Sequence, residues 1–460
     1  MEQNAIENVT RLFLEMSENF KTKTNCKKNY IEYISSLLYL KYADSIAFER
    51  IYNERENNYS AELMDDTLKE LRRKLENPKL FSNIKFKNIK NIRPMGEENV
   101  LIPILEKLYL LEKKLDLSKE ETKKIIAKAY ERLVEICFQQ KDILNISGTI
   151  YTPRSITNLL ANLIAKDKRV VFDPYCGTGN FLLSASSKAI KMIGLEEEDC
   201  LYNICMTNLF LHDINNANIF NYYEIPKIDE SKYDCIITNP PFSQKNWEKI
   251  LKIEVLSTIN PVHTPIKVYG DYAFILYMLD CLKEDGKIGV ILPQGVLFRK
   301  NEKYVRKYLI RNNYIETVIG LPEKLFFNTK VSVIILILSK QKKNRDTLFI
   351  DASKCYKSVK ANNQLTEEGI EEISRIYHNR EIKENFSYRA SIEEIDKNDY
   401  SLMIKKYIKE EPVKKVKIEK QEILTELEKL EKETTILENN INNVLDSLGL
   451  FDIFNHNKKE

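Results

Sequence analysis

A four-residue motif near the middle of the chain combines residue types that can hold an aromatic amine. It consists of Asn239, Pro240, Pro241 and Phe242 and directly follows the apolar run Tyr233–Thr238. An exocyclic amine on an aromatic ring is a poor nucleophile, because its lone pair is delocalised into the ring. The side-chain carbonyl of Asn239 and the backbone carbonyl of Pro240 can accept hydrogen bonds from such an amine and favour a reactive geometry.

The aromatic member of the motif, Phe242, can stack on the ring that carries the amine. A base within a nucleic-acid helix is reached only after it leaves the stack, and methyltransferases are among the enzymes that flip their target base. The motif therefore predicts methylation of an amino group. Four residues alone leave a second interpretation open, a strand that ends in an ordinary Pro-Pro turn.

A second group of residues, upstream of this motif, predicts a nucleoside-binding site. The short apolar run 169–172 leads into a turn with two glycines and then into the helical run 181–185. Glycines at a strand-to-helix turn let the backbone approach a ligand closely. The residues of this turn are Asp173, Pro174, Tyr175, Cys176, Gly177, Thr178, Gly179 and Asn180.

The next predicted strand, 192–195, delivers Glu196, whose carboxylate can bind ribose hydroxyls. A dinucleotide fingerprint needs a third small residue after Gly177 and Gly179, but Leu182 stands at that position. This departure weakens an NAD site and favours S-adenosylmethionine, which has no pyrophosphate to hold. Together with the amine-binding motif, the layout predicts a methyltransferase.

Several further segments, in the same order along the chain, resemble the modification (M) subunits of type I restriction-modification systems. These subunits are adenine-N6 DNA methyltransferases, and the resemblance runs from about residue 30 to about residue 450. The matching segments outside the two sites above are 38–44, 148–154, 211–214, 271–274, 290–298, 319–322 and 349–352. So many matches in order are far more specific than any single motif.

The resemblance implies transfer of the methyl group of S-adenosylmethionine to the N6 amine of adenine in double-stranded DNA. It makes the motif at 239–242 the catalytic site, and its leading Asn favours adenine over cytosine N4, whose enzymes more often begin with Ser or Thr. The residues that it assigns to the cofactor are Gly148, Thr149, Ile150, Tyr151, Thr152, Pro153, Asp173, Gly177, Thr178, Gly179, Asn180 and Glu196.

Two alternative functions remain open. Glutamine-N5 protein methyltransferases and some RNA methyltransferases share an Asn-Pro-Pro-aromatic motif, although they do not generally combine it with the other matching segments. The second alternative is a non-catalytic scaffold with a degenerate cofactor pocket. It is supported by Tyr222 and Tyr223, which stand where the family usually has a Gly-Asp or Gly-Asn pair near the adenine of the cofactor.

The overall charge does not by itself indicate nucleic-acid binding. The 460 residues include 71 Lys and Arg against 68 Asp and Glu, which gives a net charge of +3. Any DNA contact must then come from local basic patches, although most such clusters are ordinary solvated helix faces. The candidate patch consists of Arg299, Lys300, Lys303, Arg306, Lys307 and Arg311.

Cysteine and histidine usage points away from metal chemistry. The eight cysteines contain no C-x-x-C pair and the four histidines are scattered, so neither a metal site nor a disulfide framework is predicted. Cys176 is interpreted as a small loop residue and His212 as a helix-end residue. With no signal peptide and no apolar run of about 18 residues, the sequence predicts a cytoplasmic protein without a membrane partner.

Three regions are predicted along the chain. Residues 1–140 form an N-terminal helical domain, residues 141–405 form the methyltransferase domain, and residues 406–460 form a helical coiled-coil tail. The middle region alternates strands and helices as a doubly wound α/β fold requires. Both motifs follow strand ends, so they are expected at the carboxyl edge of the sheet. The predicted strands are 169–172, 192–195, 233–238, 287–292, 315–319 and 331–338.

The tail carries a heptad seam, in which apolar residues recur at alternating steps of four and three. Such a seam favours pairing with another helix over packing on its own domain. In the family that the chain resembles, this tail contacts a separate specificity subunit, while a restriction subunit and a second copy of the chain are further partners that remain open. The seam residues are Ile423, Leu427, Leu430, Leu437, Ile441, Val444 and Leu448, with Thr434 in the gap.

Overall fold

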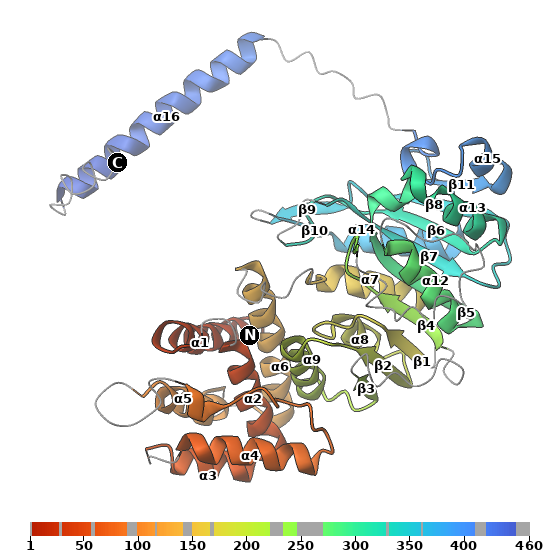
Figure 1. The fold of residues 1–460 in the computed structure, drawn as a ribbon. Coiled ribbons are helices and arrows are strands. Elements are labelled where there is room, and N and C mark those ends of the chain that lie inside the picture. Colours follow the sequence, from red (N-terminus) through yellow and green to blue (C-terminus); the bar gives the residue numbers. More distant parts are fainter. Residues whose placement is uncertain are drawn as a thin grey trace. The chain divides into compact units, whose positions relative to one another are not determined.

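The chain folds as two units, which Figure 1 shows in a computed structural model. The first is Met1–Lys409 and the second is Glu410–Glu460. The residues that the structure describes are 2–26, 30–56, 60–89, 99–115, 117–140, 150–165, 170–220, 233–245, 270–327, 331–359, 362–409 and 420–447. Among these residues, no helix is both long enough and apolar enough to cross a membrane.

The N-terminal part of the first unit is helical, as predicted. Its central helix is α2, which is buried from Tyr30 to Lys41 because nearly every one of its faces is apolar. Helix α6 begins at a capping box, in which the Ser118 and Glu121 side chains each accept from the backbone N–H of the other. The described helices here are α1 (Glu2–Lys23), α2 (Tyr30–Ala43), α3 (Ser45–Asn53), α4 (Ser60–Lys74), α5 (Leu101–Leu115) and α6 (Lys119–Gln139).

A mixed sheet forms the centre of the remainder of the first unit. Within the described residues its strand order is β11-β8-β6-β7-β5-β4-β1-β2-β3. All neighbouring strands are parallel except where β7 and β11 pair with their neighbours. The strands are β1 (Val170–Asp173), β2 (Lys191–Leu195), β3 (Ala217–Phe220), β4 (Tyr233–Thr238), β5 (Leu282–Pro293), β6 (Ile315–Gly320), β7 (Val333–Ser339), β8 (Asp346–Asp351) and β11 (Ser387–Ser391).

Helices cover both faces of this sheet, which confirms the doubly wound α/β architecture (Figure 1). One face packs against α12 (Asp271–Cys281), α13 (Lys303–Arg311) and α15 (Ile392–Lys397). The other face packs against α7 (Arg154–Ile164), α8 (Asn180–Ala185) and α14 (Glu367–Asn379). The six predicted strands correspond to β1, β2, β4, β5, β6 and β7, whereas β3, β8 and β11 were not predicted as strands.

Helix α9 (Asp199–Leu211) belongs to two hydrophobic cores at once. Leu201 and Ile204 are buried in the core of the N-terminal helices, whereas Cys205 and Leu209 are buried in the core beneath the sheet. The helical part and the α/β part therefore share their interior within the first unit. The domain boundaries at residues 140 and 405 stay predictions.

A buried carboxylate, Glu131 of α6, also connects the two parts. It pairs with Arg154 of α7 at 3.2 Å and with His212 at 2.7 Å, and His212 caps the C-terminal end of α9. Burial opposes ionisation of Glu131, but the hydrogen bond from His212 and the charge of Arg154 lower its pKa below the usual value. The interpretation of His212 as a helix-end residue is confirmed.

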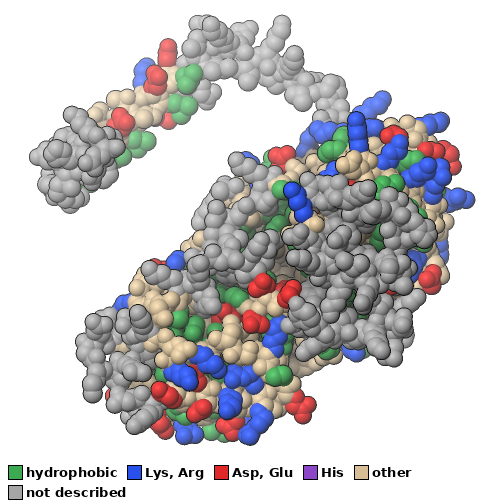
Figure 2. All heavy atoms as spheres, in the orientation of Figure 1, with side chains coloured by type: hydrophobic (Ala, Val, Ile, Leu, Met, Phe, Trp, Pro, Cys, Tyr) green, Lys and Arg blue, Asp and Glu red, His purple; other side chains and the backbone are tan. Residues whose placement is uncertain are grey.

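The predicted basic patch is wrong for Arg306, which is only 2% exposed. Its guanidinium donates to the backbone carbonyls of Tyr400 at 2.8 Å and of Val296 and Arg299 at 3.0 Å. The sequence shows only that residue 306 is a cation. In the structure this cation is buried and connects the backbone near residues 296–299 with that of Tyr400. Figure 2 shows Lys and Arg side chains over the same end of the first unit, where α13 and α15 lie in Figure 1.

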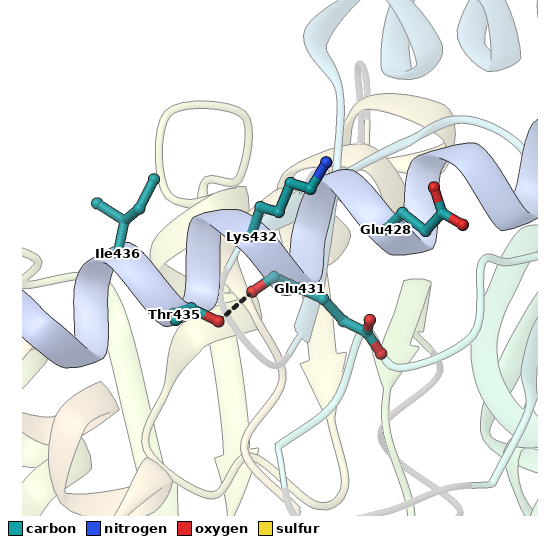
Figure 3. Close-up of a pocket in the computed structure, with 5 residues that line it drawn as sticks. All are labelled: Glu428, Glu431, Lys432, Thr435 and Ile436. Carbon is teal, nitrogen blue, oxygen red and sulfur yellow. Dashed lines mark hydrogen bonds between the residues drawn. The ribbon is translucent and has the colours of Figure 1, made fainter.

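The second unit contains helix α16 (Lys420–Ser447). The seam residues whose side chains the structure describes are exposed in this unit, with Leu430 at 54%, Leu437 at 61% and Ile441 at 55%. Figure 3 shows part of this helix, where the Thr435 hydroxyl donates to the backbone carbonyl of Glu431 at 2.8 Å. The helical character of the tail agrees with the sequence, while the coiled-coil pairing stays a prediction.

Arg306 provides a test of this packing. Arg306→Ala leaves the buried Tyr400 carbonyl without its donor, whereas the Val296 and Arg299 carbonyls keep the Tyr272 hydroxyl and the Glu302 N–H as donors. A buried acceptor without a donor costs roughly 1–3 kcal/mol, so we expect the free energy of unfolding to fall by about 1–3 kcal/mol. Lys300→Ala, at an exposed neighbour, is the control and should change it by less than about 0.5 kcal/mol. Urea unfolding of both variants measures the difference, and equal stabilities would show that Arg306 is not a structural connector.

Candidate active site

Parallel pairing of β1 with β4 brings the two predicted motifs side by side. Val171 is opposite Cys235 and Phe172 is opposite Ile236, so the strands end at the same edge of the sheet. From this pair the sheet continues through β2 and β3 on one side and through β5 on the other. Open α/β sheets bind ligands at such a reversal of strand order. The glycine turn after β1 and Asn239 after β4 therefore face the same crevice.

The side chain of Asn239 is held with its carbonyl oxygen unused. Its Nδ2 donates to the Thr152 hydroxyl at 2.9 Å. Its Oδ1 is buried and has no hydrogen-bond partner among the described residues. An acceptor left in this state is costly unless a ligand supplies the donor. The geometry thus fits the predicted acceptance of a hydrogen bond from an amine.

The loop that follows Asn239 is fixed from outside the motif. The buried carboxylate of Asp271 accepts from the Ser243 backbone N–H at 2.9 Å and pairs with the Arg299 guanidinium at 2.7 Å. Arg299 also donates to the Ser243 hydroxyl at 3.0 Å. The prediction of Arg299 as part of a DNA-binding patch therefore missed its position in this buried network. The sequence indicates segment 271–274 only through its resemblance to the family.

The other motif residues differ in how deeply they are buried. Pro240 is buried, and Pro241 and Phe242 are partly buried. Phe242 packs against the core on the side of the sheet that carries α7 and α8. Its stacking on a base stays a prediction.

The turn after β1 has the backbone conformation that only glycine adopts readily. Gly177 and Gly179 have φ values of 52° and 85°. A Cβ on Gly179 would lie 2.9 Å from the Cys205 sulfur, so α9 leaves no room for a side chain there. Asn208 of α9 holds the turn by donating from Nδ2 to the Thr178 carbonyl at 2.9 Å. Sequence reasoning missed Asn208, which lies just before the noted segment 211–214.

Two buried carboxyl groups lie at the base of this turn. Glu196 accepts from the Gly177 backbone N–H at 3.1 Å and from the Glu198 N–H at 2.8 Å, and burial raises its pKa to about 7. Asp173 accepts from the Tyr175 N–H at 3.1 Å, and burial raises its pKa to about 7 as well. The second carboxylate oxygen of Asp173 has no partner among the described residues.

The segment before α7 covers the turn. Asn180 donates from Nδ2 to the Thr152 carbonyl at 3.0 Å, while its own Oδ1 is buried without a partner in the described part of the chain. Tyr151 packs against Phe138 of α6, with ring centroids 5.2 Å apart. Phe138 is a contribution of the helical part that no sequence signal indicated. Gly148 and Thr149 lie outside the described residues, as do Tyr222 and Tyr223.

These elements enclose a narrow pocket. Its cavity volume is about 30 Å³. The lining residues are Phe138, Ile150, Tyr151, Thr152, Tyr175, Cys176, Gly177, Thr178, Asn180, Phe181 and Asn239.

Cys176 lies in this pocket but is poorly suited to be a nucleophile. Its hydrogen bond with Cys205, together with burial, raises the pKa of its thiol well above the usual value. The thiol stays protonated near neutral pH, in agreement with its interpretation as a small loop residue.

Comparison with curated proteins gives consistent relatives. The chain is 34% identical to the type I restriction enzyme MjaVIII methylase subunit of Methanocaldococcus jannaschii, over 62% of this chain and 54% of that protein. It is 33% identical to the MjaVII methylase subunit of the same organism, over 74% of this chain and 62% of that protein. The chain thus spans rather more than half the length of these relatives.

Solved structures show the same fold. The methyltransferase subunit of a type I restriction-modification system from Streptococcus thermophilus has a TM-score of 0.69 and 24% identity, over 88% of this chain and 99% of that one. A putative class I S-adenosylmethionine-dependent methyltransferase from Listeria monocytogenes has a TM-score of 0.51 and 16% identity, over 82% and 98%. The model of the N-6 DNA methylase family matches residues 121–416, more than half of the chain. The chain belongs to the N-6 DNA methylase family.

Proposed function

We propose that this chain transfers the methyl group of S-adenosylmethionine to the N6 amine of adenine in double-stranded DNA, as the modification subunit of a type I restriction-modification complex. The observation that carries the proposal is the buried, unpaired carbonyl of Asn239, held by Thr152 beside the glycine turn. Membership of the N-6 DNA methylase family supports a DNA base as the substrate. It also disfavours a protein glutamine or an RNA base.

The donor set of the pocket fits the proposed cofactor. S-adenosylmethionine offers ribose hydroxyls and an ammonium group as hydrogen-bond donors, and the site offers acceptors. Glu196 would hold the ribose hydroxyls, while the unpaired oxygens of Asp173 and Asn180 suit the remaining donors. The left-handed glycines let the backbone come close to the ligand. Bound there, the cofactor supplies an activated methyl group on its sulfonium.

The chain's own task is to position the amine. The carbonyls of Asn239 and Pro240 each accept one N–H of the adenine N6 amine, and Phe242 stacks on the ring. The nitrogen forms a bond to the methyl carbon as the bond from carbon to the sulfonium sulfur breaks, and the excess proton leaves the nitrogen for solvent. Effective molarities for such oriented reactions are large, so positioning accounts for much of the rate.

The proposed partner of the tail is a specificity subunit. Exposed apolar residues at heptad spacing on α16 support this partner, because such a seam leaves its apolar surface exposed to water unless another helix covers it. A restriction subunit and a second copy of the chain remain further candidates. Target recognition would then depend on the specificity subunit.

The first functional prediction separates the amine site from the cofactor site. Asn239→Ala should abolish methyl transfer and leave cofactor affinity nearly unchanged, because Asn239 acts on the acceptor amine. Glu196→Ala should weaken cofactor binding at least tenfold. Calorimetric titration with S-adenosylmethionine and mass spectrometry of digested DNA measure the two effects. If Glu196→Ala bound S-adenosylmethionine as tightly as the unchanged chain, the role of Glu196 would be contradicted. N4-methylcytosine as the only product would contradict adenine as the substrate base.

Cofactor binding should depend on pH around neutrality. Glu196 has a pKa of about 7 in the unliganded chain, and ribose hydroxyls donate best to its ionised form. Below that pH the chain must release a proton on binding, so the dissociation constant should rise as the pH falls from 8 to 6. Glu196→Gln, which cannot ionise, should reduce this slope. A slope that is the same in both proteins would show that Glu196 does not titrate on binding.

The tail prediction compares two exposed apolar positions on α16. Leu437→Asp, on the seam, should abolish co-purification with the specificity subunit and sequence-specific methylation, because it places a charge in the interhelical contact. Ile436→Asp, off the seam and equally exposed at 59% against 61%, is the matched control. Truncation after Pro412 should behave like Leu437→Asp while cofactor binding persists. If the truncated chain still assembled with the specificity subunit, the contact would lie elsewhere in the chain.

A further inference from the structure

A small hairpin rises from the edge of the sheet that carries the active site. Its strands are β9 (Tyr356–Val359) and β10 (Asn362–Leu365), and it follows directly after β8. Strand β8 is parallel to β6, and both run in the direction of β4 because β7 is antiparallel to β5 and to β6. The hairpin and Asn239 therefore lie at the same edge. Figure 1 shows the hairpin projecting beyond the sheet.

One face of the hairpin is anchored to the first unit. Two hydrogen bonds hold Asn363 in place: its backbone N–H donates to the Lys324 carbonyl and its Nδ2 donates to the Glu323 carbonyl, both at 2.9 Å. Leu365 on the same face is 3% exposed. The Ser358 hydroxyl crosses to the Asn363 Oδ1 at 3.1 Å. The hairpin is thus a fixed projection rather than a loose loop.

On the opposite face, no side chain forms a hydrogen bond or ion pair with another described residue. This face carries Lys357 and Val359 from β9 and, in register with them, Gln364 and Asn362 from β10. Val359 is 45% exposed, and Lys357 and Gln364 are also exposed. None of these four residues is acidic. One cation, two amides and one aliphatic group on a two-stranded ribbon are the means by which ribbons contact phosphates and base edges in DNA grooves.

The surroundings of this face are basic as well. Lys354 precedes β9 and Lys324 lies in the anchoring loop, and both are exposed. Lys324, Lys354 and Lys357 form no ion pair with another residue in the described part of the chain. The acidic residues nearby in sequence are Asp351 at the end of β8, Glu323 in the anchoring loop, and Glu367 and Glu368 at the start of α14. The described strands of the hairpin themselves carry one cation, Lys357, and no acidic residue.

We propose that the β9–β10 hairpin is a DNA-contacting ribbon that binds the duplex beside the flipped adenine; this inference rests on the proposed function. Four strand spacings separate β8 from β4 in the sheet order, which is about 19 Å at roughly 4.8 Å each. A duplex that lies along the strand order, at about 3.4 Å per base pair, would meet the hairpin roughly six base pairs from the target. Lys354 and Lys357 contact phosphates, and Asn362, Gln364 and Val359 enter the groove.

The test compares two double charge reversals in the full chain. Lys354→Glu with Lys357→Glu changes the hairpin. Lys343→Glu with Arg345→Glu makes the same change in net charge at the opposite edge, in the exposed connection between β7 and β8. Fluorescence anisotropy with a random-sequence duplex of about 40 base pairs, at salt concentrations from 50 to 200 mM, reports the affinity and its salt dependence.

The hairpin variant should bind the duplex about tenfold or more weakly, with a salt slope smaller by about 1.8 if two phosphate contacts are lost. The control variant should keep the slope of the unchanged chain, and both should bind S-adenosylmethionine normally. Asn362→Ala with Gln364→Ala should weaken DNA binding without changing the slope, because amides are uncharged.

Equal DNA binding by the two charge variants would overturn the proposal, as would a failure of the unchanged chain to bind the duplex at the lowest salt concentration. A hairpin variant that keeps its DNA affinity but loses a co-purifying protein would assign the hairpin to a protein partner instead. Methyl transfer by the native complex distinguishes a failure of the hairpin proposal from a failure of the proposed function. If the native complex methylates adenine and the hairpin variants do so with an unchanged KM for DNA, the hairpin proposal fails while the proposed function stands.

Discussion

The candidate active site depends on the parallel pairing of β1 with β4. This pairing places the end of β1, with Asp173 and the glycine turn, beside the end of β4, with Asn239. The chain between the two strands, 174–232, is 59 residues long, so only the sheet can bring their ends together. The alignment is rigid because both strands are interior to the sheet and buried on both faces. The proposed amine contact of Asn239 and the cofactor contacts of Asp173 and the glycine turn are made from this junction, and Glu196 joins them from the end of β2, the neighbour of β1.

The helical part is a structural component of that junction. Its buried Glu32 accepts from Asn203 of α9 at 2.9 Å, and Asn203 accepts in turn from the Phe81 backbone N–H at 2.8 Å. Lys79 donates to the carbonyl of Glu196 at 3.1 Å, directly behind the proposed ribose contact. Phe138 forms part of the pocket wall. Changes in the helical part can therefore reach the cofactor site through packing, without any contact to the cofactor itself.

The sequence by itself determined the class of fold and the two local motifs on which the proposed chemistry rests. Asn239 and the glycine turn are local signals, because a carbonyl pair at a strand end and a left-handed turn depend on residues that are adjacent in the chain. The six predicted strands are short runs rich in apolar residues, as buried strands require. The strands that were not predicted, β3, β8 and β11, show a weaker pattern. For example, β11 (Ser387–Ser391) is mostly polar and gains its stability from pairing with β8.

Only the tertiary structure decided which polar residues serve the site and which serve the fold. Arg299 and Arg306 look alike in sequence, as cations of one basic run, yet one anchors the loop after Asn239 and the other is buried against three carbonyls. Asn208 and Phe138 reach the site from elements that carry no motif. Burial and hydrogen bonding are set by residues far apart in the chain, and a local pattern contains no information about such distant partners.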